Sequence, residues 1–234
     1  MRIVTAFLIL HFASQSCLAE EPHKLSKHFV MIYGTTEPQG ISRTFPAVAI
    51  KADGNSTILA TASWGGELFP VPPAGRKVDR FHVLDSDQNV EFLSCDEARG
   101  VALFRVASAV PLWPADQMHT TPLTAGEELD WLKLPNREYR TETPKQSTVK
   151  AANTKLPYTT PQGKVVTVND TLTFDGKVGG PPGTFMLKDG KLAAVWLNND
   201  VSNDIIHHAI TASAFMSGAE QCLAQLSATQ DSAK

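Results

Sequence analysis

Hydrophobic residues occur in short runs separated by turn-forming residues through most of the chain. In the first half these runs are rich in β-branched and aromatic residues, which favours strands over helices. Gly34, the Asp53-Gly54-Asn55 turn and the prolines between 70 and 75 separate them. The predicted strands of this half lie at 28–33, 47–50, 56–60, 81–84 and 101–106.

A second group of runs follows a polar, proline-containing stretch at 107–124. Strict alternation of hydrophobic and polar residues is weak in both groups, as expected where strands curl and glycine or proline marks the corners. The pattern therefore predicts an all-β protein built as two small barrels or as a sandwich. The strands predicted in the second group lie at 128–134, 147–152, 165–168, 171–174, 184–187 and 192–197.

One helix is predicted, near the carboxyl end. Phe215, Ala219, Cys222, Leu223 and Leu226 fall on one face of a helix over about 212–226. This face is expected to pack on the strands, whereas the polar tail at 227–234 is expected to fray.

The amino end has the pattern of a signal peptide. Met1 and Arg2 precede an apolar run from Ile3 to Ala13, and small or polar residues lead to Ala19. The run is much shorter than the roughly 20 residues that a membrane span requires, so a membrane anchor is the weaker interpretation. Cleavage after residue 19 predicts a mature chain at 20–234, exported to a periplasm or secreted. Acylation at Cys17 is a further alternative.

Charge and cysteine content narrow the functional classes. The chain has 234 residues, with 21 Lys and Arg against 24 Asp and Glu, so it lacks the basic surface that recruits nucleic acid. No second apolar stretch approaches a membrane span. Cys95 and Cys222 remain after the signal peptide, either as a disulfide or as two buried thiols. The absence of CxxC pairs argues against a metal or redox motif, and we expect neither metal nor cofactor.

Five segments, in this order and spacing, resemble the chymotrypsin-fold serine peptidases of the HtrA/Deg type. These segments are 47–62, 99–106, 122–135, 176–195 and 209–215. The resemblance implies two six-stranded antiparallel β-barrels, at about 28–106 and 122–210, with the active site between them and a carboxy-terminal α-helix. No room remains after the helix for the PDZ module that many such peptidases carry.

The resemblance also predicts that the catalytic triad is lost. The position of the catalytic His falls on Ser63, and that of the Asp falls on Gly100. Spacing from the Asp189-Gly190 turn puts the nucleophile at Pro181, whereas matching the letters of the family's glycine-rich loop puts it at Val178. In the first register Gly179 is left as one oxyanion donor, because proline has no N–H.

A peptidase fold that has lost its catalytic residues can still bind a peptide. Trp64 lies beside the expected cleft, and the family counterpart of Ala194, Val195 and Trp196 pairs with the substrate backbone. An extended peptide or protein partner is therefore expected to add as a strand. One alternative is an active serine endopeptidase with a displaced centre, in which Ser63 or Ser213 is served by His82 or His208. Another is a purely structural domain.

Overall fold

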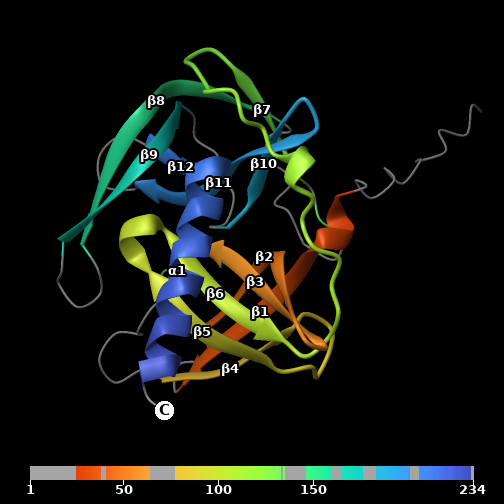
Figure 1. Cartoon of the computed structure of the whole chain (residues 1–234). Helices are drawn as coiled ribbons and strands as arrows, with labels where there is room; N and C mark the ends of the chain where they lie inside the picture. The colour runs from red at the N-terminus through yellow and green to blue at the C-terminus, as the bar shows by residue number, and fades with distance from the viewer. Residues whose placement is uncertain are drawn as a thin grey trace, which may run out of the picture.

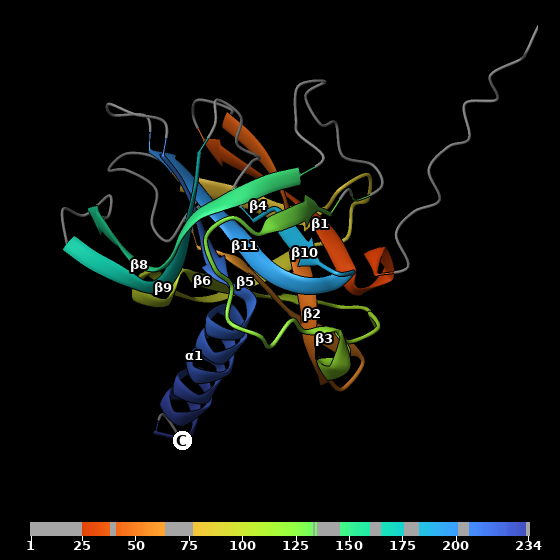
Figure 2. The same ribbon diagram turned by 90° about the horizontal axis from the view of Figure 1, so that it is seen from above.

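The computed structural model describes residues 25–37, 41–63, 77–132, 134, 146–159, 165–175, 183–200 and 206–232. Two bodies of antiparallel strands lie one above the other, and a single α-helix runs along one side of both (Figure 1). The view from above places this helix outside the strands (Figure 2). The predicted fold class, a double β-barrel with a carboxy-terminal helix, is confirmed.

The first barrel is a six-stranded sheet in the order β4-β1-β2-β3-β6-β5. An isolated bridge between His82 and Asn89 joins its two end strands. Phe45, Phe81 and Phe104 pack in its interior, with ring centroids 5.1–6.3 Å apart. The strands are β1 (Phe29–Glu37), β2 (Ile41–Asp53), β3 (Ser56–Ala62), β4 (Lys77–Val83), β5 (Val90–Asp96) and β6 (Val101–Val106).

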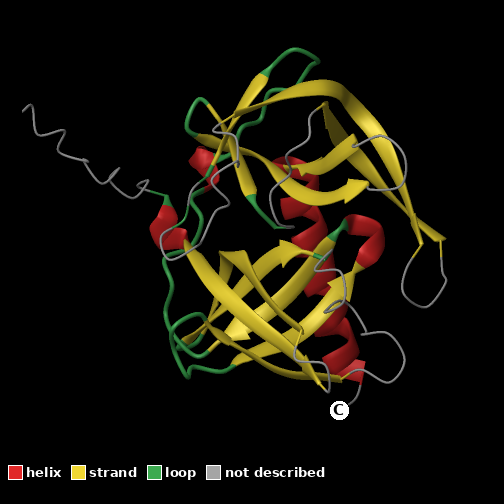
Figure 3. Ribbon diagram, turned by 180° about the vertical axis from the view of Figure 1, so that it is seen from behind, coloured by secondary structure: helices red, strands yellow, loops and turns green. Residues whose placement is uncertain are grey.

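The second barrel is closed, in the order β10-β11-β12-β9-β8-β7. Trp196 is completely buried inside it, 4.8 Å from the ring of Trp131 and 5.5 Å from that of Phe174. Figure 3 shows both barrels from behind. The strands are β7 (Glu128–Trp131), β8 (Gln146–Thr159), β9 (Val165–Asp175), β10 (Phe185–Lys188), β11 (Lys191–Asp200) and β12 (Ile206–Thr211).

Three details differ from the predicted elements. Strand β5 was not among the predicted strands, because Glu91 and Phe92 are exposed and its sequence lacks a clear apolar run. Strand β12 was also missing from the predicted set. The two strands predicted around Asp170 form one strand, β9, because that residue adopts a left-handed backbone (φ 54°) inside a bulge instead of ending the strand.

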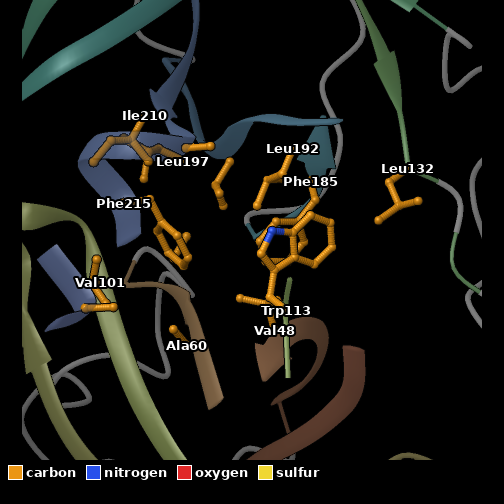
Figure 4. Packing of buried hydrophobic residues seen from close by; sticks show 14 of the residues in the cluster. Val48, Ala60, Val101, Trp113, Leu132, Phe185, Leu192, Leu197, Ile210 and Phe215 are labelled. Carbon is orange, nitrogen blue, oxygen red and sulfur yellow. The ribbon is translucent and has the colours of Figure 1, made fainter. Parts of the chain in front are cut away.

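A hydrophobic cluster, the inter-barrel core, joins the two barrels. Val48 and Val101 enter it from the first barrel, Phe185 and Leu197 from the second (Figure 4). Trp113 contributes from the connecting segment, and Phe215 from the helix. The Trp113 amide donates to Ala49 O at 2.8 Å and the His119 amide to Leu192 O at 2.8 Å, so this segment is fixed to both barrels.

The helix α1 (Ala212–Ser232) is 21 residues long and extends beyond the predicted end at residue 226. It packs against β5, β6, β11 and β12, and thus against both barrels. Gly218 permits this close approach, since a Cβ there would lie 3.1 Å from Arg99 Cβ and 3.2 Å from Val101 Cγ2. Arg99 Nε also donates to Gln221 Oε1 at 2.8 Å.

The close helix contact predicts the effect of adding a side chain. Gly218→Val is expected to lower the free energy of unfolding by about 1–3 kcal/mol, because the added atoms overlap Arg99 and Val101. Urea unfolding measures the change. Ala224→Val, on the exposed side of the same helix, is the control for the helix propensity of valine. Equal losses in the two variants would contradict the close contact.

Candidate functional site

The structure brings Ser63 and Gly100 together at the ends of two neighbouring strands. Strand β3 pairs with β6 so that Ala62 lies opposite Val101. The next residue of β3 and the residue before β6 are therefore adjacent, and the Ser63 amide donates to Gly100 O at 2.9 Å. This is the neighbourhood that the resemblance implies for the base and the carboxylate of a peptidase.

Ser63 has no means of acting as the base. Its side chain is 3% exposed, and its Oγ is buried without a hydrogen-bond partner among the described residues. A hydroxyl at this position takes no proton from a nucleophile near neutral pH, whereas an imidazole does.

Gly100 lies close against apolar side chains of the second barrel. It has φ 68°, and a Cβ there would lie 3.2 Å from Leu197 Cδ2 and 3.6 Å from Val168 Cγ1. Both of these side chains belong to the inter-barrel core. An ionised Asp at this position would therefore lie against apolar groups of the second barrel, at a high desolvation cost.

The loop expected to hold the nucleophile, with Val178, Gly179 and Pro181, lies outside the described residues, as does Trp64. The chain resumes at Gly183, whose amide donates to Trp196 O at 2.8 Å. Gly183 has φ 82°, and a Cβ there would lie 2.8 Å from Thr61 Oγ1. The carboxyl end of this loop is therefore held against β3, two residues from Ser63.

The residues of the displaced-centre alternative lie on different elements. Ser213 is at the exposed start of α1, with its Oγ 3.4 Å from Thr211 Oγ1. His82 is on an end strand of the first barrel, where its ring lies 4.8 Å from that of Tyr33. His208 is buried in β12, opposite Asn198 and Thr173.

The pairing of β11 corrects the expected peptide-binding edge. Ala194, Val195 and Trp196 are completely buried, and Val195 pairs with Phe185 of β10 and with Ile210 of β12. Both sides of the strand are thus occupied at these residues. Past Trp196 the strand continues to Asp200, and among the described strands only β12 pairs with this last part.

Cys95 and Cys222 are free thiols. Cys95 packs beside the interior cluster of the first barrel, whereas Cys222 belongs to the inter-barrel core and interacts with the Ser94 side chain. Since successive residues of a strand point to opposite faces, the two thiols approach β5 from different sides. Burial raises the pKa of both thiols, and the charge of Glu97 raises that of Cys95 further.

This arrangement of strands is the fold of the chymotrypsin-type serine proteases. No family model matches the chain, and no curated protein does. Among solved structures, the Rv3671c protease of M. tuberculosis in its active form has a TM-score of 0.58 at 15% identity, over 85% of this chain and 82% of that one. An inactive serine-to-alanine mutant of Rv3671c has a TM-score of 0.56 at 19% identity, over 88% and 89%.

The MamO protease domain of Magnetospirillum magneticum, in its apo form, has a TM-score of 0.53 at 10% identity, over 83% of this chain and 97% of that domain. Identities this low establish the shared fold alone. Within the described part of the chain, no helix has the length and apolar character to cross a membrane. The described residues likewise contain no group of three or more His, Cys, Asp or Glu side chains placed to hold a metal ion.

Restoring a carboxylate at position 100 is expected to destabilise the protein. Gly100→Asp should lower the free energy of unfolding by roughly 2–4 kcal/mol, from its left-handed backbone together with overlap with Leu197. The matched control is Gly54→Asp, in a turn with φ 60° and nothing within 4 Å of the added Cβ, which measures the backbone cost alone. Denaturant unfolding of both variants checks the difference, and equal losses would contradict the apolar contact.

The buried thiols predict slow alkylation. A raised pKa leaves little thiolate at pH 8, so iodoacetamide should modify Cys95 and Cys222 slowly in the native protein and rapidly after unfolding. Peptide mass spectrometry without reduction measures both residues. A linked peptide containing both cysteines would contradict the free thiols.

Proposed function

We propose that this chain is an exported, catalytically inactive homologue of the trypsin-like serine peptidases that binds an extended segment of a peptide or protein. The observation that carries the proposal is the contact at Gly100, where apolar side chains of the second barrel lie against the position at which the resemblance expects the triad carboxylate. The export rests on the signal-peptide pattern at residues 1–19.

The loss of catalysis follows from what an acyl-transfer mechanism requires. A serine nucleophile needs a base to receive its proton and a carboxylate to orient that base. Position 63 offers a buried hydroxyl and position 100 offers no side chain. Loss of one triad member lowers the rate of such enzymes by roughly four to six orders of magnitude, so a centre without base and orienter retains no useful rate.

Binding requires less of the same site. An extended segment recognises a strand edge through main-chain hydrogen bonds, which depend on the backbone and not on a triad. The end of β11, at Asn198–Asp200, pairs with β12 on one side and is available on the other among the described strands. Trp64, next to Ser63 in the sequence, is the proposed apolar contact for a side chain of the bound segment.

Two measurements on the mature chain test this function. A fluorophosphonate probe should label no serine, with an active double-barrel peptidase as positive control. Reduced, carboxymethylated α-lactalbumin, which exposes extended segments, should bind in fluorescence anisotropy without being cleaved. Labelling of any serine would overturn the inactive assignment, and absence of binding would favour a structural domain.

The binding mode has its own test. A peptide of α-lactalbumin that binds should lose affinity when alternate backbone amides are N-methylated, because methylation removes the donors that a strand edge needs. Trp64→Ala should weaken binding by roughly tenfold, the value of one buried aromatic contact. Leu112→Ala, at an exposed apolar residue of the connecting segment, is the control. Equal binding of methylated and unmethylated peptides would contradict strand addition.

A further inference from the structure

A cavity with polar lining lies on the second barrel, between the connecting segment, residues of β8, β9, β11 and β12, and the start of α1. It has a volume of about 390 Å³, within the range of roughly 300–1,000 Å³ that is usual for small-molecule sites. Its lining includes Thr211, Ser213 and Ser217, at and after the start of α1, and Asn153 and Asp170, from β8 and β9. None of these residues takes part in the proposed peptide site.

Two of the strand residues that line this cavity, Asn153 and Asp170, have a left-handed backbone conformation. Asn153 has φ 54° in β8 and Asp170 has φ 54° in β9, and the register of the two strands shifts on either side of their pairing at Thr154 and Thr171. Each residue thus lies in a bulge. Bulges redirect side chains and occur often beside functional sites, and these two give the same cavity a carboxylate and an amide.

These side chains are available to a ligand. Among the described residues, neither Asn153 nor Asp170 has a hydrogen-bond or ion-pair partner, and both are exposed. In the described part of the chain, the other non-glycine residues with positive φ are Asp85 and Asp189, which lie in turns between strands, where this conformation is ordinary. Asn153 and Asp170 differ from these turn residues because they lie in bulges within the strands of the barrel.

The charges around the cavity select a neutral ligand. His119 is the only basic side chain among its described lining residues, and the Asp170 carboxylate repels a phosphate or carboxylate group. The start of α1, which also borders the cavity, carries the positive end of the helix dipole and offsets part of the Asp170 charge, so the lining has no strong preference for a cation. Hydroxyl, amide and carboxylate groups together can both donate to and accept from the hydroxyls of a ligand.

From this lining we infer that the cavity binds a small, neutral, polyhydroxylated molecule, of the size of a mono- or disaccharide. Asp170 and Asn153 contact its hydroxyls from one side, and the hydroxyls of Thr211, Ser213 and Ser217 contact it from the other. The apolar side chains of Leu172 and Ala193, which also line the cavity, face its C–H groups.

The test uses protein-observed NMR with glucose, mannose, galactose, N-acetylglucosamine and maltose as probes. At least one should give saturable shifts at residues around Asp170 and Ser213. Glucosamine, glucuronate and alanine are the charged and zwitterionic comparators and should bind more weakly. No saturable response to any neutral sugar, or tighter binding of a comparator, would overturn the inference.

Variants locate the site. Asp170→Asn keeps the size of the side chain and tolerates positive φ, and it should weaken sugar binding by about tenfold through loss of a charge-assisted hydrogen bond. Asp189→Asn, at the same backbone conformation (φ 51°) in the exposed β10–β11 turn, is the matched control and should bind normally. Ser217→Phe, on the exposed side of α1, should block the cavity without disturbing the fold.

Equal binding by Asp170→Asn, Ser217→Phe and the unchanged protein would contradict this location. Binding of carboxymethylated α-lactalbumin is expected to be the same in all of these variants. The test of sugar binding is therefore independent of the test of the proposed function.

Discussion

The apolar contact between the two barrels is the interaction on which the rest of the structure depends. Each barrel has its own apolar interior, yet the side chains of Val48, Val101, Phe185 and Leu197 are buried in the inter-barrel core instead. Apolar surface removed from water stabilises a fold by about 25 cal/mol per Å². Trp113 and Phe215 complete the same cluster, so the connecting segment and the helix are held by it too.

In the proposed function, this contact takes the place of a hydrolytic centre. In a serine peptidase the interface between barrels contains a network of polar groups, each of which must be hydrogen-bonded to be tolerated away from water. Here Gly100 and Ser63 meet that interface with no side chain and with one small hydroxyl. At this position the barrels gain apolar packing. A charged pair there would need hydrogen-bond partners to offset its removal from water.

The sequence predicted the double barrel because turn residues and β-rich runs carry their own local signal, and because five segments keep the order of a known family. It also singled out Ser63 and Gly100, which the structure places side by side at the ends of β3 and β6. It did not predict β5, because the exposed Glu91 and Phe92 interrupt the pattern typical of a strand. It also did not predict that Ala194–Trp196 are buried, since this depends on pairing with β10 and β12. The bulges at Asn153 and Asp170 could not be predicted either, because the register between distant strands is set by tertiary packing.

The order of elements, with α1 after both barrels, has a consequence for folding during synthesis. The first barrel leaves the ribosome early, but its apolar face toward the second barrel, and the surface beside Arg99 and Val101 where Gly218 packs, are covered only when the last strands and the helix arrive. Until then the nascent chain exposes apolar side chains, the condition that recruits chaperones and promotes aggregation. Final folding of these surfaces therefore waits for this 21-residue helix, which follows both barrels in the sequence.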